Sequence, residues 1–279
     1  MATLNGRRPW TFYALSLFFV LYVIFIYGPM FIVFLLSFQG QTGGLTFPMQ
    51  SMSLHWYREL FSNASAGDIP GAIKRSLLLA SVVMVVTLVI SVLAGLAFRK
   101  PFRGSTAIFF ITTASLIVPG ILVGLGIGQL AFLVGVRAHW LTTGLGAQLT
   151  WTLPFGMLII FAVFGRFDGI LEEVASDLGA TPWQRFTNVI VPILFPGMIA
   201  VALFGFTLSY DEFARSLLTA GADNTLPLEI WALMTNVTTP KLYAIGTLTT
   251  VTSLLVIIIS MATIFLLLRK RNAGTKSSE

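Results

Sequence analysis

The sequence has no cysteine and few charged residues. The absence of cysteine excludes disulfides and thiolate chemistry, although it does not identify a cellular compartment. Only 10% of the residues are charged, whereas ordinary soluble domains carry roughly 25%. Together with a hydrophobic content of 56%, this composition predicts an integral membrane protein.

Motifs for enzyme chemistry are also missing. The sequence contains no HExxH, no Cys/His cluster, no G-x-S-x-G and no Walker lysine motif, and His55 and His139 both fall outside the long apolar segments. We therefore expect no catalytic residues, no metal and no cofactor bound by this chain. The net charge of +6 does not indicate a nucleic acid partner, because basic residues matter for binding only where they form a solvent-facing patch.

Six charge-free windows are long enough to cross a hydrocarbon core, which takes about 20 apolar residues. None shows the strict alternation of a barrel strand. The sequence therefore predicts an all-α integral membrane fold, with residues 1–279 forming a single transmembrane domain. The six transmembrane helices are expected at approximately residues 12–38, 77–98, 106–134, 147–165, 190–211 and 244–268.

The distribution of basic residues predicts the orientation. Placing both termini in the cytoplasm puts most of the 17 Lys and Arg residues on that side, as the positive-inside rule requires.

In the first window, Gly28-Pro29 is expected to kink or end the helix. After it, SLHWYRELF (residues 53–61) predicts a short interfacial helix with its aromatic residues on one face. This helix is an anchor or a docking surface.

In the third window, Gly120, Gly124 and Gly128 recur every four residues. Small residues at this spacing allow a neighbouring helix to approach closely within a membrane. We interpret them as a packing surface.

A polar interval at residues 166–189 separates the fourth and fifth windows, and its signals predict two short helices. Asp168 can cap the first helix, which has Glu172 and Glu173 in its early turns. Gly179 is well placed as its left-handed stop. Thr181-Pro182-Trp183-Gln184 then combines an N-cap Thr, a first-turn Pro and a capping-box Gln.

The predicted hairpin is amphipathic. Ile170, Leu171, Val174 and Leu178 share one face of the first helix. Such an element can insert into a groove of a partner protein, or it can lie against its own membrane face. The residue pattern alone leaves both interpretations open.

The hairpin also resembles the EAA signature of permease subunits from binding-protein-dependent ABC importers. The likeness lies in Glu173-Val174-Ala175, Gly179, Phe186 and Val189-x-Val191-Pro192. Val174 departs from the family, which usually has Ala there. The resemblance implies a cytoplasmic coupling-helix hairpin that docks in a cleft of the ATPase subunit. The residues expected to serve this ATPase coupling are Glu172, Glu173, Ala175, Asp177, Gly179, Ala180, Phe186 and Pro192.

A finer resemblance follows the fifth window. YDEFARSLLTAG (residues 210–221) and NTLPLEIWALMTNVTTPKLYAIGTLT (residues 224–249) look like the spermidine/putrescine permease branch and its opine and phosphonate relatives. The resemblance implies a multi-pass subunit of an ATP-driven importer in the bacterial inner membrane, forming half of the pathway for a polyamine or a related amine or opine. A phosphonate or an amino-acid-like solute remains an alternative, and a stand-alone secondary transporter is a weaker one.

The same resemblance implies partners. These are ABC ATPase subunits that bind the ATP, a second permease subunit and a periplasmic or extracellular solute-binding protein, in addition to membrane lipid. A membrane-embedded enzyme is disfavoured, because no convergent set of catalytic polar groups is visible.

Candidate residues for the substrate pathway or gate lie at the end of the fifth window. They are Tyr210, Asp211, Glu212 and Phe213. Carboxylates at this depth are costly unless they are paired, hydrated or line a pathway, and they would attract a cationic amine. The alternative for Asp211 is an ordinary ion pair with Arg215 at i+4, and both interpretations remain open.

Overall fold

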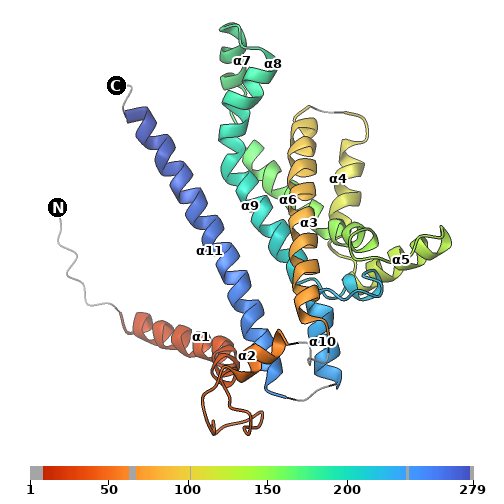
Figure 1. The fold of residues 1–279 in the computed structure, drawn as a ribbon. Helices are drawn as coiled ribbons and strands as arrows, with labels where there is room; N and C mark the ends of the chain where they lie inside the picture. The colour runs from red at the N-terminus through yellow and green to blue at the C-terminus, as the bar shows by residue number, and fades with distance from the viewer. Residues whose placement is uncertain (1–8, 63–66, 101, 237–238, 277–279) are drawn as a thin grey trace. The chain divides into compact units, whose positions relative to one another are not determined.

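The computed structural model describes residues 9–62, 67–100, 102–236 and 239–276. Within these ranges the regular elements are helical, apart from one isolated antiparallel bridge between Gln39 and Met52. The helices, seen in Figure 1, are α1 (Trp10–Leu36), α2 (His55–Leu60), α3 (Ile69–Phe98), α4 (Ser105–Ala114), α5 (Gly120–Leu133), α6 (Thr143–Phe164), α7 (Ile170–Asp177), α8 (Pro182–Arg185), η1 (Phe186–Ile190), α9 (Val191–Tyr210), η2 (Ser216–Leu218), α10 (Leu226–Asn236) and α11 (Lys241–Lys276).

The chain divides into two compact units. One comprises Met1–Ala66 with Leu233–Val251, and the other comprises Gly67–Ala232 with Thr252–Glu279. In the first unit, α1 continues through Pro29 instead of ending there. The short helix expected from SLHWYRELF is confirmed as α2, which buries Trp56 and Leu60 and leaves Phe61 exposed.

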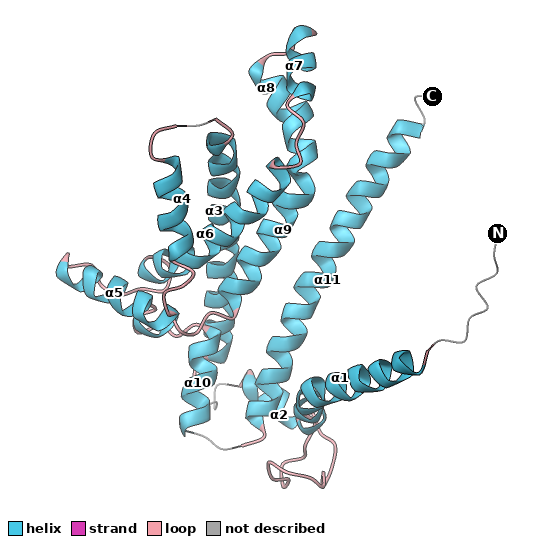
Figure 2. Cartoon of the chain, turned by 180° about the vertical axis from the view of Figure 1, so that it is seen from behind, coloured by secondary structure: helices cyan, strands magenta, loops and turns pink. Residues whose placement is uncertain are grey.

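In the second unit, α3, α6 and α9 pack side by side (Figures 1 and 2). Val92 of α3, Ile160 of α6 and Leu194 of α9 contribute to one buried apolar cluster. Small residues allow the close approach: a Cβ atom added to Gly156 of α6 would collide with the Ser91 hydroxyl of α3. These three helices form the frame that carries α7 and α8 at one end (Figure 1), and η2 follows the other end of α9.

The third expected transmembrane helix, at residues 106–134, is not one helix. It is divided into α4 and α5, and neither is long enough to cross a membrane alone. The interruption covers residues 115–119: α4 ends at Ala114, and Pro119 is the N-cap residue of α5. Proline has no N–H to donate and disfavours helical geometry in the preceding residue. Hydrophobicity indicates that a segment lies in the membrane, but it does not reveal whether the helix is continuous.

Five helices in the described part of the chain are long and apolar enough to span a membrane. They are α1, α3, α6, the continuous run Pro182–Tyr210 and the Lys241–Ile259 part of α11. Six uninterrupted spanning helices are therefore not confirmed.

The fifth expected helix begins earlier than residue 190. Helices α8, η1 and α9 form a continuous run, so Pro192 and Pro196 lie inside a helix and not at its start. The turn before Pro192 is π-helical, and such wide turns accommodate a position where the regular ladder of hydrogen bonds is broken. The second half of the polar interval is thus an extension of a spanning helix.

Candidate functional site

Helix α7 ends in a Schellman motif centred on Gly179. The Gly179 N–H donates to the carbonyl of Ser176 at 2.9 Å, and the Ala180 N–H donates to the carbonyl of Ala175 at 3.0 Å. Gly179 has φ +84°, the left-handed conformation that this motif requires. The predicted helix stop is therefore confirmed, and three of the residues expected in the coupling loop, Ala175, Gly179 and Ala180, act together in it.

The predicted capping box at the start of α8 is also confirmed. The Gln184 backbone N–H donates to the Thr181 hydroxyl at 3.3 Å, while the Thr181 backbone N–H donates to the side-chain oxygen Oε1 of Gln184 at 2.8 Å. At the start of α7 the N-cap residue is Gly169 and not Asp168, although the Asp168 carboxylate accepts a hydrogen bond from the Ile170 N–H at 3.0 Å. The turn between α7 and α8 is held by the Schellman motif on one side and by the capping box on the other.

The apolar face of this hairpin is exposed. Helix α7 buries no residue within the chain. Leu178 is 84% exposed, Trp183 is 71% exposed, and the other members of the face are exposed as well. These are Ile170, Leu171 and Val174. A preorganised hairpin with an uncovered apolar face has the character of a docking element.

The acidic residues of α7 differ in their surroundings. Glu173 and Asp177 are exposed, whereas the Glu172 carboxylate pairs with the Arg99 guanidinium. The hydrogen bond from Arg99, opposed by partial burial, holds the pKa of Glu172 below its ordinary value. The partner of Glu172 lies 73 residues earlier in the chain, so no local pattern could have identified it.

The two remaining residues expected in the coupling loop lie along the continuous helix. The ring of Phe186, in η1, is tilted against that of Trp183, at 5.7 Å between centroids. Phe186 also packs against the buried cluster shared by α3, α6 and α9, whereas Pro192 is half-buried in the first turn of α9. The hairpin is therefore linked to the helix bundle through η1.

The four residues expected in the pathway do not share one environment. Tyr210 is buried and stacks on Phe206, at 5.9 Å between ring centroids. Asp211, the C-cap residue of α9, is exposed. Phe213 lies with its ring 5.5 Å from that of Trp231.

Glu212 is buried, and its partner is Arg215. One Glu212 oxygen accepts the Arg215 backbone N–H at 2.8 Å, and the other lies 3.4 Å from the Arg215 guanidinium. The i+4 ion pair between Asp211 and Arg215, which the sequence left open, is therefore wrong. Glu212 is the carboxylate that pairs with Arg215, because the turn after α9 directs the Glu212 side chain inward and leaves the Asp211 side chain exposed.

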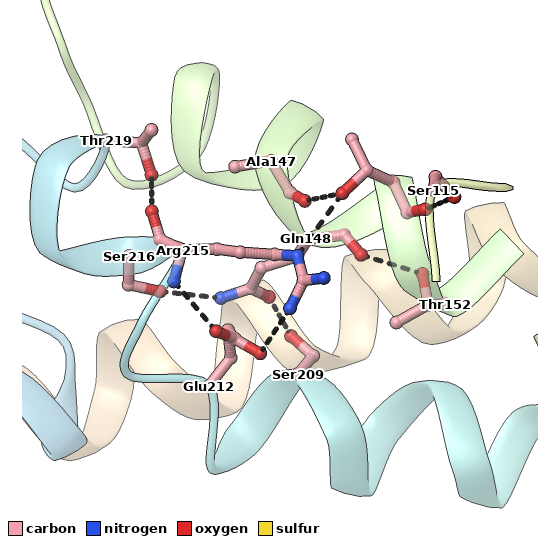
Figure 3. Close-up of polar contacts among 10 residues, drawn as sticks. Ser115, Ala147, Gln148, Thr152, Ser209, Glu212, Arg215, Ser216 and Thr219 are labelled. Atoms are coloured by element: carbon pink, nitrogen blue, oxygen red, sulfur yellow. Dashed lines mark hydrogen bonds and ion pairs between the residues drawn. The ribbon is translucent and has the colours of Figure 1, made fainter. Parts of the chain in front are cut away.

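The Glu212–Arg215 pair belongs to a larger polar network, drawn in Figure 3. Arg215 donates to the Thr150 hydroxyl at 3.3 Å and lies 4.7 Å from the ring centroid of Trp151. Buried Gln148 donates to the Ser216 hydroxyl at 3.0 Å and accepts a hydrogen bond from Ser209. The network joins α6, the end of α9 and η2. Gln148, a strongly polar residue in the fourth window, is the sequence signal that could have pointed to it.

The glycines of α5 pack against this network. A Cβ atom on Gly124 would lie 2.8 Å from the Arg215 carbonyl oxygen, and one on Gly128 would lie 2.9 Å from that of Leu218. The prediction of a packing surface is confirmed, but its neighbour is the short η2 segment and not a long helix.

We expect Gly124→Ala to lower the stability of the folded protein by about 1–3 kcal/mol, the usual cost of overpacking. Gly126→Ala is the matched control, since its Cβ atom would meet nothing within 4 Å. The measurement is the thermal unfolding of the two purified variants in the same detergent. Equal thermal unfolding midpoints for the two variants would show that the close approach of Gly124 to Arg215 does not contribute to stability.

Among the described residues, no group of three His, Cys, Asp or Glu side chains is placed to hold a metal ion.

A family model for the inner membrane component of binding-protein-dependent transport systems matches residues 87–273. The match covers well over half of the chain, and the chain belongs to this family. It is therefore a multi-pass inner-membrane transport component and not an enzyme.

Individual relatives are permeases. The chain is 29% identical over 255 residues to the spermidine/putrescine transport system permease protein PotC of Haemophilus influenzae. The aligned residues cover 91% of this chain and 95% of the relative. The chain is 28% identical over 251 residues to the putrescine transport system permease protein PotI of Escherichia coli K12, covering 87% and 86% respectively.

Solved structures share the fold. A bacterial ABC transporter involved in the import of the acidic polysaccharide alginate matches with a TM-score of 0.70 and 16% identity, covering 92% of this chain and 95% of that one. The MetNI methionine ABC transporter, in inward facing conformations, matches with a TM-score of 0.57 and 17% identity, covering 71% and 95%. At these identities the likeness shows the fold alone.

Proposed function

We propose that this chain is a permease subunit of an ATP-driven importer, that it forms half of a translocation pathway, and that its solute is a polyamine or a related amine or opine. The observation that carries the proposal is the preorganised hairpin, whose exposed apolar face lies at the end of a continuous spanning helix. The substrate class is supported by the relatives named as spermidine/putrescine and putrescine permeases. A phosphonate or an amino-acid-like solute is the alternative for the same machinery.

The proposed topology has six crossings within a single transmembrane permease domain of residues 1–279. The helices α4 and α5 together would supply one broken crossing, since each is too short to span alone. Both termini and the loop 166–189 would face the cytoplasm, which is supported by the excess of Lys and Arg on that side. The hairpin of α7 and α8 would then be exposed to cytoplasmic partners.

The proposed partners are ABC ATPase subunits at the hairpin, a second permease subunit and a solute-binding protein. The residues assigned to ATPase coupling are the eight named from the resemblance: Glu172, Glu173, Ala175, Asp177, Gly179, Ala180, Phe186 and Pro192. A related importer has been solved in complex with an alginate pentasaccharide-bound periplasmic protein, which supports the third partner. Nucleotide-driven movement of the hairpin would pass along η1 into α9, because the helix between them is continuous.

The proposal is tested by purifying the protein from its native membrane in mild detergent and identifying what remains bound. We expect an ATPase subunit, a second permease and a solute-binding protein, and we expect putrescine or spermidine to bind to the last. Recovery of this chain alone, folded and able to move solute without ATP, would overturn the proposal in favour of a secondary transporter.

Asp211 is the candidate pathway residue that the structure leaves available to a solute, since Glu212 is committed to Arg215. We expect Asp211→Asn to reduce putrescine uptake about fivefold or more, because a carboxylate at the mouth attracts a cationic amine. Assembly with the ATPase should remain unchanged. Asp223→Asn is the control, as Asp223 is another exposed acid. Normal uptake by Asp211→Asn would remove Asp211 from the pathway.

A further inference from the structure

Arg99 connects the end of one spanning helix to the hairpin. It is the C-cap residue of α3, and its guanidinium lies 5.2 Å from the ring centroid of Phe164 and 4.8 Å from that of Phe167. Phe164 ends α6, and Phe167 lies in the short link to α7. Cations stack on aromatic faces in this way, so these two rings hold the guanidinium independently of its contact with α7.

Glu172 is the residue of α7 that meets this cation. Its carboxylate accepts a hydrogen bond from Nη2 of Arg99, and the two side chains are 20% and 25% exposed respectively. The neighbouring Glu173 is exposed. The pKa of Glu172 is lowered, first by the hydrogen bond from Arg99, so the carboxylate is ionised at neutral pH. Its charge is therefore neutralised within the chain, whereas that of Glu173 remains available to a partner.

Helix α7 has little else to hold it against α3. It buries no residue, and a cavity of about 700 Å³ lies beside it, with Leu96, Lys100 and Ser176 in its lining. Arg99 and Glu172 line the same cavity. Of the ion pairs found in the described ranges, theirs is the one that joins α7 to a spanning helix. The pair thus crosses a space in which α7 is otherwise loosely packed.

We propose that Arg99 and Glu172 are a positioning pair that passes movement of α7 to α3, in parallel with the route through η1 and α9. This inference rests on the proposed function, because it takes α7 to be the element that the ATPase moves. It also changes the role of Glu172. Of the two adjacent carboxylates, Glu173 is the one offered to the ATPase, and Glu172 holds the hairpin to its own subunit.

The test uses the complete importer and two fluorescent reporters. Because the chain has no cysteine, single cysteines can be introduced at Leu93 of α3 and at Phe204 of α9, both exposed, and labelled with bimane once the reactive cysteines of the partner subunits are replaced. The signal is the fluorescence change on addition of a non-hydrolysable ATP analogue. The variants are Arg99→Gln and Glu172→Gln, the exchange Arg99→Glu with Glu172→Arg, and the control Lys100→Gln.

We expect both single variants to retain the ATPase but to reduce the response at position 93 about fivefold or more, the lower end of coupling between linked sites. The response at position 204 should persist. The charge exchange should restore part of the response at position 93, and Lys100→Gln should leave both responses unchanged, because Lys100 is the neighbouring cation but makes no ion pair with Glu172. A merely structural role would instead alter both reporters together.

An unchanged response at position 93 in both single variants would overturn the inference. Release of the ATPase by Glu172→Gln but not by Arg99→Gln would also overturn it, since Glu172 would then contact the partner directly. The inference would also be overturned if the two single variants and the charge-exchange variant all failed to insert into the membrane. A failure of the proposed function would give a different result. The chain without these substitutions would retain no ATPase, and neither reporter would respond to nucleotide.

Discussion

Replacing Gly179 by valine is expected to leave membrane insertion intact and to reduce retention of the ATPase about tenfold or more. Gly179 has φ +84°, and an L-residue in the left-handed conformation is destabilised by roughly 1–2 kcal/mol, more when it is β-branched. A penalty of that size is about tenfold in a binding equilibrium. The readout is the amount of ATPase that co-purifies with the variant, together with putrescine uptake.

This effect arises from the left-handed backbone conformation at position 179 and not from a steric collision of the new side chain. A Cβ atom at position 179 would meet nothing within 4 Å. The substitution instead disfavours the Schellman motif, and with it the orientation of Leu178 relative to Trp183 on the exposed apolar face. The hairpin would persist as two helices, but its docking face would no longer be preorganised.

The matched control is Gly169→Val. Gly169 lies at the other end of α7, also has open space around it, and has φ −61°, which any residue adopts. Gly179→Asn should be intermediate, because asparagine tolerates the left-handed conformation better than other residues with a Cβ atom. Equal ATPase retention by the two valine variants would contradict the role assigned to the Schellman motif.

Replacing Arg215 by methionine is expected to destabilise the folded protein by about 3–5 kcal/mol, the cost of leaving one member of a buried ion pair without its partner. The side chains of Arg215 and Glu212 are 8% and 5% exposed. Methionine would also remove the hydrogen bond to Thr150 and the contact with Trp151. The measurement is the yield and thermal midpoint of purified protein in detergent, and the unfolding should begin at the η2 end of the second unit.

The informative comparison is the double variant Glu212→Gln with Arg215→Met. Removing both charges leaves no uncompensated ion, and Gln can still accept the backbone N–H of residue 215, so we expect much of the stability to return. Arg137→Met serves as the control, because Arg137 is exposed. If the double variant were no more stable than Arg215→Met, the loss would arise from packing against Trp151 and not from the buried charge.

Much of the structure of the hairpin could be predicted from local sequence signals. The cap at Thr181 and Gln184 and the left-handed stop at Gly179 were predictable because each depends on residues within a few positions of one another. The long apolar windows were likewise predictable, since crossing a hydrocarbon core demands about 20 apolar residues in succession. The windows did not predict helix continuity: residues 106–134 are divided into α4 and α5 by a short non-helical segment that ends at Pro119.

The sequence by itself determined that this is a membrane protein, where its long apolar segments lie and how the ends of the hairpin helices are capped, because composition, hydrophobicity and capping are properties of short stretches. Only the tertiary structure decided which acid pairs with which base. Glu212, and not Asp211, takes Arg215, and Glu172 takes Arg99 across 73 residues. These choices depend on burial and on the packing of helices distant in the chain, and side chains that look equivalent in sequence become distinct only when the chain is folded.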